Sequence, residues 1–170
     1  HSKTAMDFAY TLFLELSRMP EIPKTDIKRY VQKWYVMSVL TGRYTSAYES
    51  TMDRDIRSIA QKGFLQYFKE TEEAALSDDF WRISLVGSLE TSSTNSPFFV
   101  LFLVAQILKR NCSLFSDRIT VENLITNGGD VHHIFPKEFL KKNGITEKYR
   151  YNQVANFTYL DTPINIWVGD

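Results

Sequence analysis

Two adjacent histidines, His132 and His133, are the side chains of this sequence best suited to acid–base or metal chemistry. The chain has 3 histidines and the third is its first residue, so the other two imidazoles stand side by side. They lie between Gly128-Gly129 and Pro136, a pattern typical of a short strand with a turn at each end. Imidazole is both a general base near neutral pH and a common metal ligand. The pair therefore predicts a site that uses one imidazole in each role.

Two asparagines further along the chain, Asn156 and Asn165, complete a set of side chains suited to phosphodiester hydrolysis. This reaction needs a base that deprotonates water, here His133, and a divalent ion that offsets the charge developing on the phosphate. The imidazole of His132 and the amide oxygen of Asn165 would form an open site for Mg²⁺ or Mn²⁺. Asn156 would hold the base in its working orientation. Asp130 is an alternative ligand, although an aspartate after two glycines is more often a turn residue.

Residues 128–168 resemble the His-Asn-His, or ββα-metal, nuclease finger. More narrowly, they resemble the C-terminal domain of unknown function 1524 (DUF1524) of GmrSD-type modification-dependent restriction enzymes. The matching motifs are His132, His133-Ile134-Phe135-Pro136, Asn156-Phe157-Thr158-Tyr159-Leu160 and Asn165, and the second asparagine stands 9 positions after the first. The stretch from Trp34 to Tyr44 also resembles the helical region before the finger in such proteins.

The resemblance implies a role for each matching residue. His133 would be the general base, and His132 would be a metal ligand where many relatives have aspartate. Asn165 would be the second ligand of a Mg²⁺ or Mn²⁺ ion, where other fingers have histidine. Asn156 would order the finger and orient the base. The last helix of the finger should continue past Asn165, but the sequence ends 5 residues later, so the finger is expected to be truncated at its C-terminus.

The same resemblance implies a metal-dependent DNA endonuclease that nicks one strand at a time within a restriction or phage-defence protein. Its partners would be DNA and a DUF262-type N-terminal domain of the same protein, which is absent from this sequence. One alternative is a catalytically inactive helical module whose degenerate finger binds DNA or a partner protein. Another is a helical regulatory domain in which the two histidines are incidental. The recognised DNA modification, the physiological metal and homo-oligomerisation do not follow from the sequence.

Contacts with a DNA backbone are expected to be local, because the formal net charge of the chain is +0. Basic residues gather around the finger: Lys137, Lys141, Lys142, Lys148 and Arg150. These side chains would follow the phosphates, and the alternative is a solvated lysine face. Arg43 is a further candidate for a phosphate contact. Its alternative role is to anchor a loop by pairing with one of three nearby carboxylates: Glu49, Asp53 or Asp55.

The elements that must position these residues are mainly helical. We predict a mainly α fold, with a helical domain over residues 1–127 and the finger over residues 128–170. Apolar residues at helical spacing predict helices over 4–18, 25–40, 52–73, 80–89, 97–110 and 116–124. Short strands are predicted over 131–135 and 154–160, with a helical turn over 137–143 and a polar connector over 148–153 between them. A further helix is predicted to start at Asp161-Thr162-Pro163.

Composition supports a cytoplasmic, non-membrane protein. The single cysteine, Cys112, excludes an internal disulfide and fits a reducing compartment. The longest apolar run, from Phe98 to Leu108, is shorter than the ~20 residues of a membrane span and predicts a buried helix instead. Hydrophobic residues make up 44% of the chain, which is enough to form a core.

Overall fold

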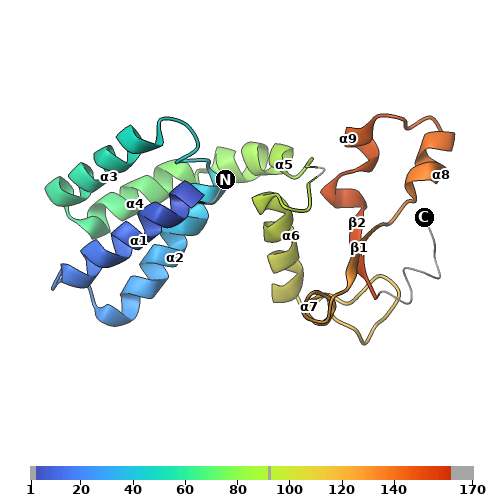
Figure 1. The fold of residues 1–170 in the computed structure, drawn as a ribbon, viewed down its shortest axis with the longest axis horizontal. Coiled ribbons are helices and arrows are strands. Elements are labelled where there is room, and N and C mark those ends of the chain that lie inside the picture. Colours follow the sequence, from blue (N-terminus) through green and yellow to red (C-terminus); the bar gives the residue numbers. More distant parts are fainter. Residues whose placement is uncertain (1–2, 92, 162–170) are drawn as a thin grey trace. The chain divides into compact units, whose positions relative to one another are not determined.

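The computed structural model describes residues 3–91 and 93–161, and the chain divides into two compact units (Figure 1). Residues 1–82 form the helical unit and residues 83–170 form the C-terminal unit. The described chain is mainly helical with one two-stranded antiparallel sheet, which confirms the predicted mainly α class. No helix in this described part is long and apolar enough to cross a lipid bilayer. Asn165 and the helix start predicted at Thr162-Pro163 lie outside the described residues.

The helical unit is built from amphipathic helices that share one aromatic core. Its main elements are α1 (Lys3–Arg18), α2 (Lys24–Leu40), α3 (Tyr48–Lys62) and α4 (Phe64–Ala75). Phe8, Leu12 and Leu16 recur at helical spacing on the buried face of α1, which packs against α2. Trp34 of α2 is fully buried and stacks on Phe8, with ring centroids 5.8 Å apart. The helices α1 and α2 form where the apolar periodicity predicts them, because each buries one apolar stripe.

The helix predicted over residues 52–73 is wrong as a single element, because it starts earlier and breaks at Gly63. Gly63 has φ +79°, a conformation that ends an α-helix and that glycine adopts without strain. Its N–H still donates to the carbonyl of Ile59 and closes α3 before α4 begins. The break turns Phe64 and Phe68 of α4 onto Tyr30 of α2, both in edge-to-face contact. The apolar periodicity continues across Gly63, so the sequence pattern does not indicate that the chain turns there.

A buried hydrogen-bond network ties the loop after α2 to α3 and α4. The carboxylate of Asp55 is fully buried and accepts hydrogen bonds from Arg43 Nε at 2.8 Å, Tyr44 Oη at 2.7 Å and Tyr67 Oη at 2.8 Å. Arg43 Nη2 forms a second contact with the same carboxylate. Trp34 Nε1 donates to the Tyr44 hydroxyl at 2.9 Å. Every polar atom of the carboxylate is therefore satisfied from inside the unit.

Burial changes the acid–base properties of this network. Burial raises the pKa of Tyr44 far above its usual range, and the hydrogen bond to Asp55 raises it further. Burial by itself would lower the pKa of Arg43, but its hydrogen bonds and charge interaction with Asp55 outweigh burial and raise the pKa. Arg43 is 17% exposed and forms the anchor that the sequence left as an alternative role. Its contact with a DNA backbone stays a prediction.

The C-terminal unit joins short helices to a small sheet. After the π-helical turn η1 (Phe80–Ser84), its elements are α5 (Leu85–Ser88), α6 (Pro97–Leu108), α7 (Val121–Thr126), β1 (Asp130–His133), α8 (Lys137–Lys142), α9 (Lys148–Tyr151), the 3₁₀ turn η2 (Val154–Asn156) and β2 (Phe157–Leu160). The helices α6 and α7, which the sequence analysis assigned to the domain over residues 1–127, belong to the same unit as the strands. The sheet therefore has its own helical support.

Several boundaries in this unit differ from the sequence predictions. The helix predicted over residues 116–124 begins only at Val121, because the hydroxyl of Thr120 caps it by accepting from the N–H of Asn123. The predicted connector contains the helix α9, and the second strand starts only at Phe157. α6 is less buried than predicted: Phe99 is its fully buried residue and packs edge-to-face on Phe157. A single small sheet covers only one face of this apolar helix, so its other faces are partly exposed.

Candidate active site

Gly128 and Gly129 position the strand that carries both histidines. Gly128 has φ +79°, and the N–H of Gly129 donates to the carbonyl of Leu124 at the end of α7. A Cβ atom on Gly129 would lie 2.9 Å from the carbonyl oxygen of Leu160 and 3.0 Å from the Leu124 side chain. Only glycine fits this approach, so β1 starts close against α7 and β2. The strands then pair in register, with His132 opposite Thr158 and His133 opposite Phe157.

His133 is the last residue of β1 and lies half-buried between two neighbours. Its ring meets Phe157 edge-on, with centroids 5.3 Å apart. Its Nε2 lies 2.9 Å from the amide oxygen of Asn152, in the loop after α9. An amide oxygen accepts hydrogen bonds and cannot donate them, so in this arrangement Nε2 carries the ring proton. In a neutral imidazole with its proton on Nε2, Nδ1 keeps the lone pair that a general base needs.

Asn156 links the turn after His133 to the end of α9, next to Asn152. Its side chain is 6% exposed, and its amide oxygen accepts from the N–H of Phe135 at 2.8 Å. The amide nitrogen donates to the carbonyls of Phe135 at 3.1 Å and Tyr151 at 2.8 Å. Phe135 belongs to the turn that follows His133, and Tyr151 directly precedes Asn152. These are the contacts that the ordering role predicted for Asn156 requires.

Replacing Asn156 with alanine is expected to lower the free energy of unfolding of the C-terminal unit by about 2–4 kcal/mol. The change removes three hydrogen bonds, two with the backbone of Phe135 and one with the carbonyl of the buried Tyr151. Urea unfolding followed by circular dichroism measures the effect. Asn143→Ala is the matched control, because its exposed amide makes one local bond to Phe139. Equal losses for the two variants would contradict the connecting role.

His132 is a buried residue whose ring lies at a cavity. It is 8% exposed, and its Nε2 has no hydrogen-bond partner among the described residues. An unpartnered buried nitrogen is costly, and a bound ion or water would remove that cost. His132 and His133 both line a cavity of about 300 Å³, together with Pro136, Lys137 and Glu138. His132, the residue predicted as metal ligand, thus lines this cavity and has a buried ring nitrogen without a partner among the described residues.

The remaining predicted metal ligands are less defined. Asn165 lies outside the described residues, and no group of three His, Cys, Asp or Glu side chains forms within residues 3–91 and 93–161. Asp130 is two positions before His132 on β1, so the two residues share one face of the strand. Glu138 also lines the cavity, where it pairs with Lys141 at 3.2 Å. Asp130 therefore stays an alternative ligand, as the sequence left it.

The predicted DNA-contacting lysines lie together on α8. Lys137 is at the cavity, and Lys142 is exposed at the end of the helix. Lys141 is half-buried, with its ammonium 5.8 Å from the centre of the Tyr151 ring. A helix of this length presents the three cations over adjacent turns, so they provide a local positive charge beside the histidines.

Sequence reasoning missed two residues at this site, Asn152 and Glu138. Asn152 lies in what reads as a polar connector, and only the fold of that segment brings it to His133. Glu138 is two positions after Pro136, and its sequence context is that of an ordinary acidic residue in the first turn of a short helix. Neither residue belongs to a motif, so no pattern in the sequence singles it out.

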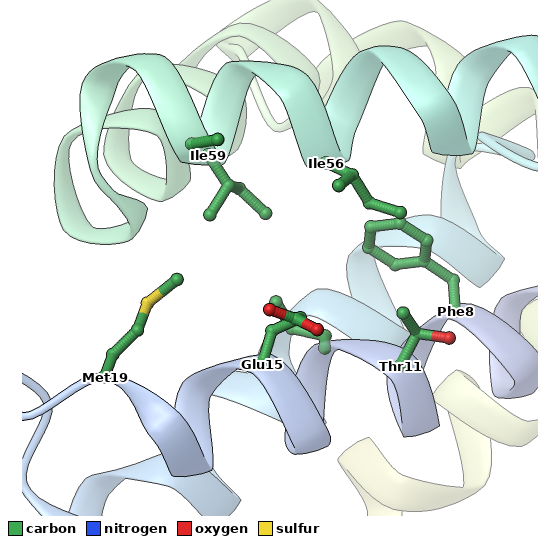
Figure 2. A pocket seen from close by; sticks show the side chains of 8 residues that line it. Phe8, Thr11, Glu15, Met19, Ile56 and Ile59 are labelled. Carbon is green, nitrogen blue, oxygen red and sulfur yellow. The ribbon is translucent and has the colours of Figure 1, made fainter.

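A second cavity lies in the helical unit, between α1 and α3. Figure 2 shows Phe8, Thr11 and Glu15 of α1 facing Ile56 and Ile59 of α3. The cavity measures about 80 Å³ and its other lining residues are Leu12, Met19 and Ala60. Its one carboxylate, Glu15, pairs with Arg18 at 3.4 Å. This lining has no imidazole, whereas the cavity of His132 and His133 has two, so we take the histidine cavity as the candidate active site.

Comparison with known proteins adds little to this geometry. No family model matches the chain, and no solved structure matches it. Over 143 residues, or 82% of the chain, the sequence is 27% identical to the uncharacterized protein MJ0686 of Methanocaldococcus jannaschii. The match spans only 23% of that protein's length. Because that protein has no assigned activity, the function must be argued from the site itself.

Proposed function

We propose that the C-terminal unit is a metal-dependent DNA endonuclease of the His-Asn-His, or ββα-metal, type. The observation that carries the proposal is the shared cavity of His132 and His133. Among the described residues, one imidazole there has an unpartnered buried nitrogen, and the Nε2 of the other lies against an amide oxygen, which would leave Nδ1 as the acceptor. The hydrogen bonds of Asn156 around the turn after His133 support the same assignment.

In this proposal His133 acts as the general base of phosphodiester hydrolysis. Its Nδ1 takes a proton from water, and the resulting oxygen nucleophile attacks phosphorus while the bond to the 3′-oxygen breaks. The leaving oxygen takes a proton from solvent, so the products are a 3′-hydroxyl and a 5′-phosphate. Lys137, at the cavity, would hold a phosphate oxygen by charge.

A divalent cation, Mg²⁺ or Mn²⁺, would supply charge neutralisation of the phosphate at this site. His132 and Asn165 would hold it, with Asp130 as the alternative oxygen ligand. The fit rests on the unpartnered Nε2 of His132 within the described residues. Imidazole and amide or carboxylate oxygens together form the kind of open, oxygen-rich site that these ions prefer.

From the sequence resemblance alone, we further propose that the activity serves DNA restriction or phage defence. A DUF262-type N-terminal domain of the same protein and cytoplasmic DNA would be its partners. Lys141 and Lys142 would extend the contact with the DNA backbone along α8.

The test is a plasmid-nicking assay on the 170-residue chain with Mg²⁺, Mn²⁺ or EDTA. We expect supercoiled plasmid to become open-circular with either metal and to remain supercoiled with EDTA. A single finger has one active site and would cut one strand at a time, so open-circular plasmid should appear before any linear plasmid. Absence of cleavage with every metal, together with DNA binding in a gel-shift assay, would contradict the nuclease and favour the inactive binding module.

A further inference from the structure

The hydrogen bond between His133 and Asn152 supports an inference about a residue that no motif contains. We propose that Asn152 is a positioning residue, which fixes the proton of His133 on Nε2 and directs Nδ1 to the reacting water. The inference rests on the proposed nuclease function. Its test therefore includes a measurement on His133 that does not require DNA cleavage.

The geometry defines which ring nitrogen is protonated. The two residues are 19 positions apart in sequence, and the amide oxygen of Asn152 lies 2.9 Å from Nε2 of His133. A neutral imidazole has one donor and one acceptor nitrogen, and the acceptor partner selects which is which. With the amide oxygen at Nε2, the proton is on Nε2 and Nδ1 is the acceptor.

Two hydrogen bonds hold the backbone at Asn152. Its own N–H donates to the carbonyl of Lys148 at 2.9 Å, which closes α9. The preceding carbonyl, of Tyr151, accepts from the buried amide of Asn156 at 2.8 Å. Phe157 bounds the imidazole of His133 by its edge-on contact. The held backbone of Asn152 on one side and the ring of Phe157 on the other limit the orientations that are open to His133.

An amide suits this role better than a carboxylate would. A carboxylate would hold the ring in the same tautomer, but it would place a negative charge near the phosphodiester. The charged groups at the cavity are already Lys137 and Glu138 of α8, beside His132 of β1. Asn152 orients the base without adding to that charge, so Asn152→Asp is expected to keep the tautomer and weaken DNA binding.

The first measurement is the tautomer of His133, read from long-range ¹H–¹⁵N correlation spectra of the chain labelled with ¹⁵N-histidine. His133→Ala assigns the signals. We expect the Nε2–H form in the unaltered chain and in Asn152→Asp, and a mixture of both tautomers in Asn152→Ala. An Nδ1–H tautomer in the unaltered chain, or an unchanged pure Nε2–H form in Asn152→Ala, would overturn the proposal.

The second measurement is nicking under saturating metal. Asn152→Ala is expected to lower kcat about 10–100-fold with little change in KM, as for other residues that orient a reacting group. Asn152→Asp should instead raise KM for DNA and keep most of kcat. Gln153→Ala is the matched control, because within the described residues its amide bonds the nearby Arg150 carbonyl and not His133, and it should behave as the unaltered chain.

The two measurements separate the possible failures. If the unaltered chain does not nick DNA, the proposed function fails, while the tautomer spectra still decide the role of Asn152. If the chain nicks DNA and Asn152→Ala retains full kcat, the positioning role is wrong and the nuclease stands. Thermal unfolding of each variant shows whether a loss of activity comes from loss of the fold.

Discussion

Replacing His133 with alanine is expected to lower metal-dependent nicking by about 10²–10⁴-fold while the C-terminal unit remains folded. Of the basic side chains that line the cavity, Lys137 is a cation and His132 is proposed to hold the ion. The imidazole of His133 is therefore the one that we assign to deprotonate water. Among the described residues, the ring makes one edge-on contact with Phe157 and one hydrogen bond to Asn152, so its loss should leave the unit folded. The substitution should therefore lower kcat.

Single-turnover nicking with enzyme in excess measures this loss without interference from product release. Tyr149→Ala is the matched control, because it removes another ring from the same unit at a position that is 67% exposed. Its rate should equal that of the unaltered chain. A His133→Ala variant that nicks at full rate would exclude the base, and one that unfolds would favour a structural role for the histidine pair.

Asp55→Ala is expected to lower the free energy of unfolding of the helical unit by about 3–5 kcal/mol. The substitution leaves the half-buried cation of Arg43 without its counter-charge. It also removes the acceptor of the Tyr44 and Tyr67 hydroxyls. Burying an uncompensated charge is the costliest of these changes, and the loss would range from about a fifth to all of an ordinary domain stability of about 5–15 kcal/mol.

Urea unfolding, followed by circular dichroism and tryptophan fluorescence, measures this effect. Asp53→Ala is the control on the same helix, because its exposed ion pair with Arg57 is worth about 0.2–1 kcal/mol at most. Asp55→Asn retains the shape of the side chain and removes the charge, so its cost should lie between the two. Similar costs for Asp53→Ala and Asp55→Ala would contradict the network as the centre of this unit.

The same residues show how far sequence reasoning reaches. Helical periodicity was sufficient for α1 and α2, whose apolar stripes are continuous and end at Pro20 and Gly42. It failed at Gly63, where the stripe of α3 continues into α4 although the chain turns. Periodicity records which side chains are apolar, whereas the direction of the chain at one residue depends on its φ and ψ.

At the candidate site, the sequence by itself singled out His132, His133 and Asn156, because their types and spacing carry a chemical pattern. It could not choose among Glu49, Asp53 and Asp55 as partner of Arg43. The tertiary structure decided that choice, since Asp55 shares the buried face of α3 with Ile59. It also decided the partners of Asn152 and Asn156. A hydrogen bond needs two atoms about 3 Å apart, and for residues some 20 positions apart only the folded path of the chain sets that distance.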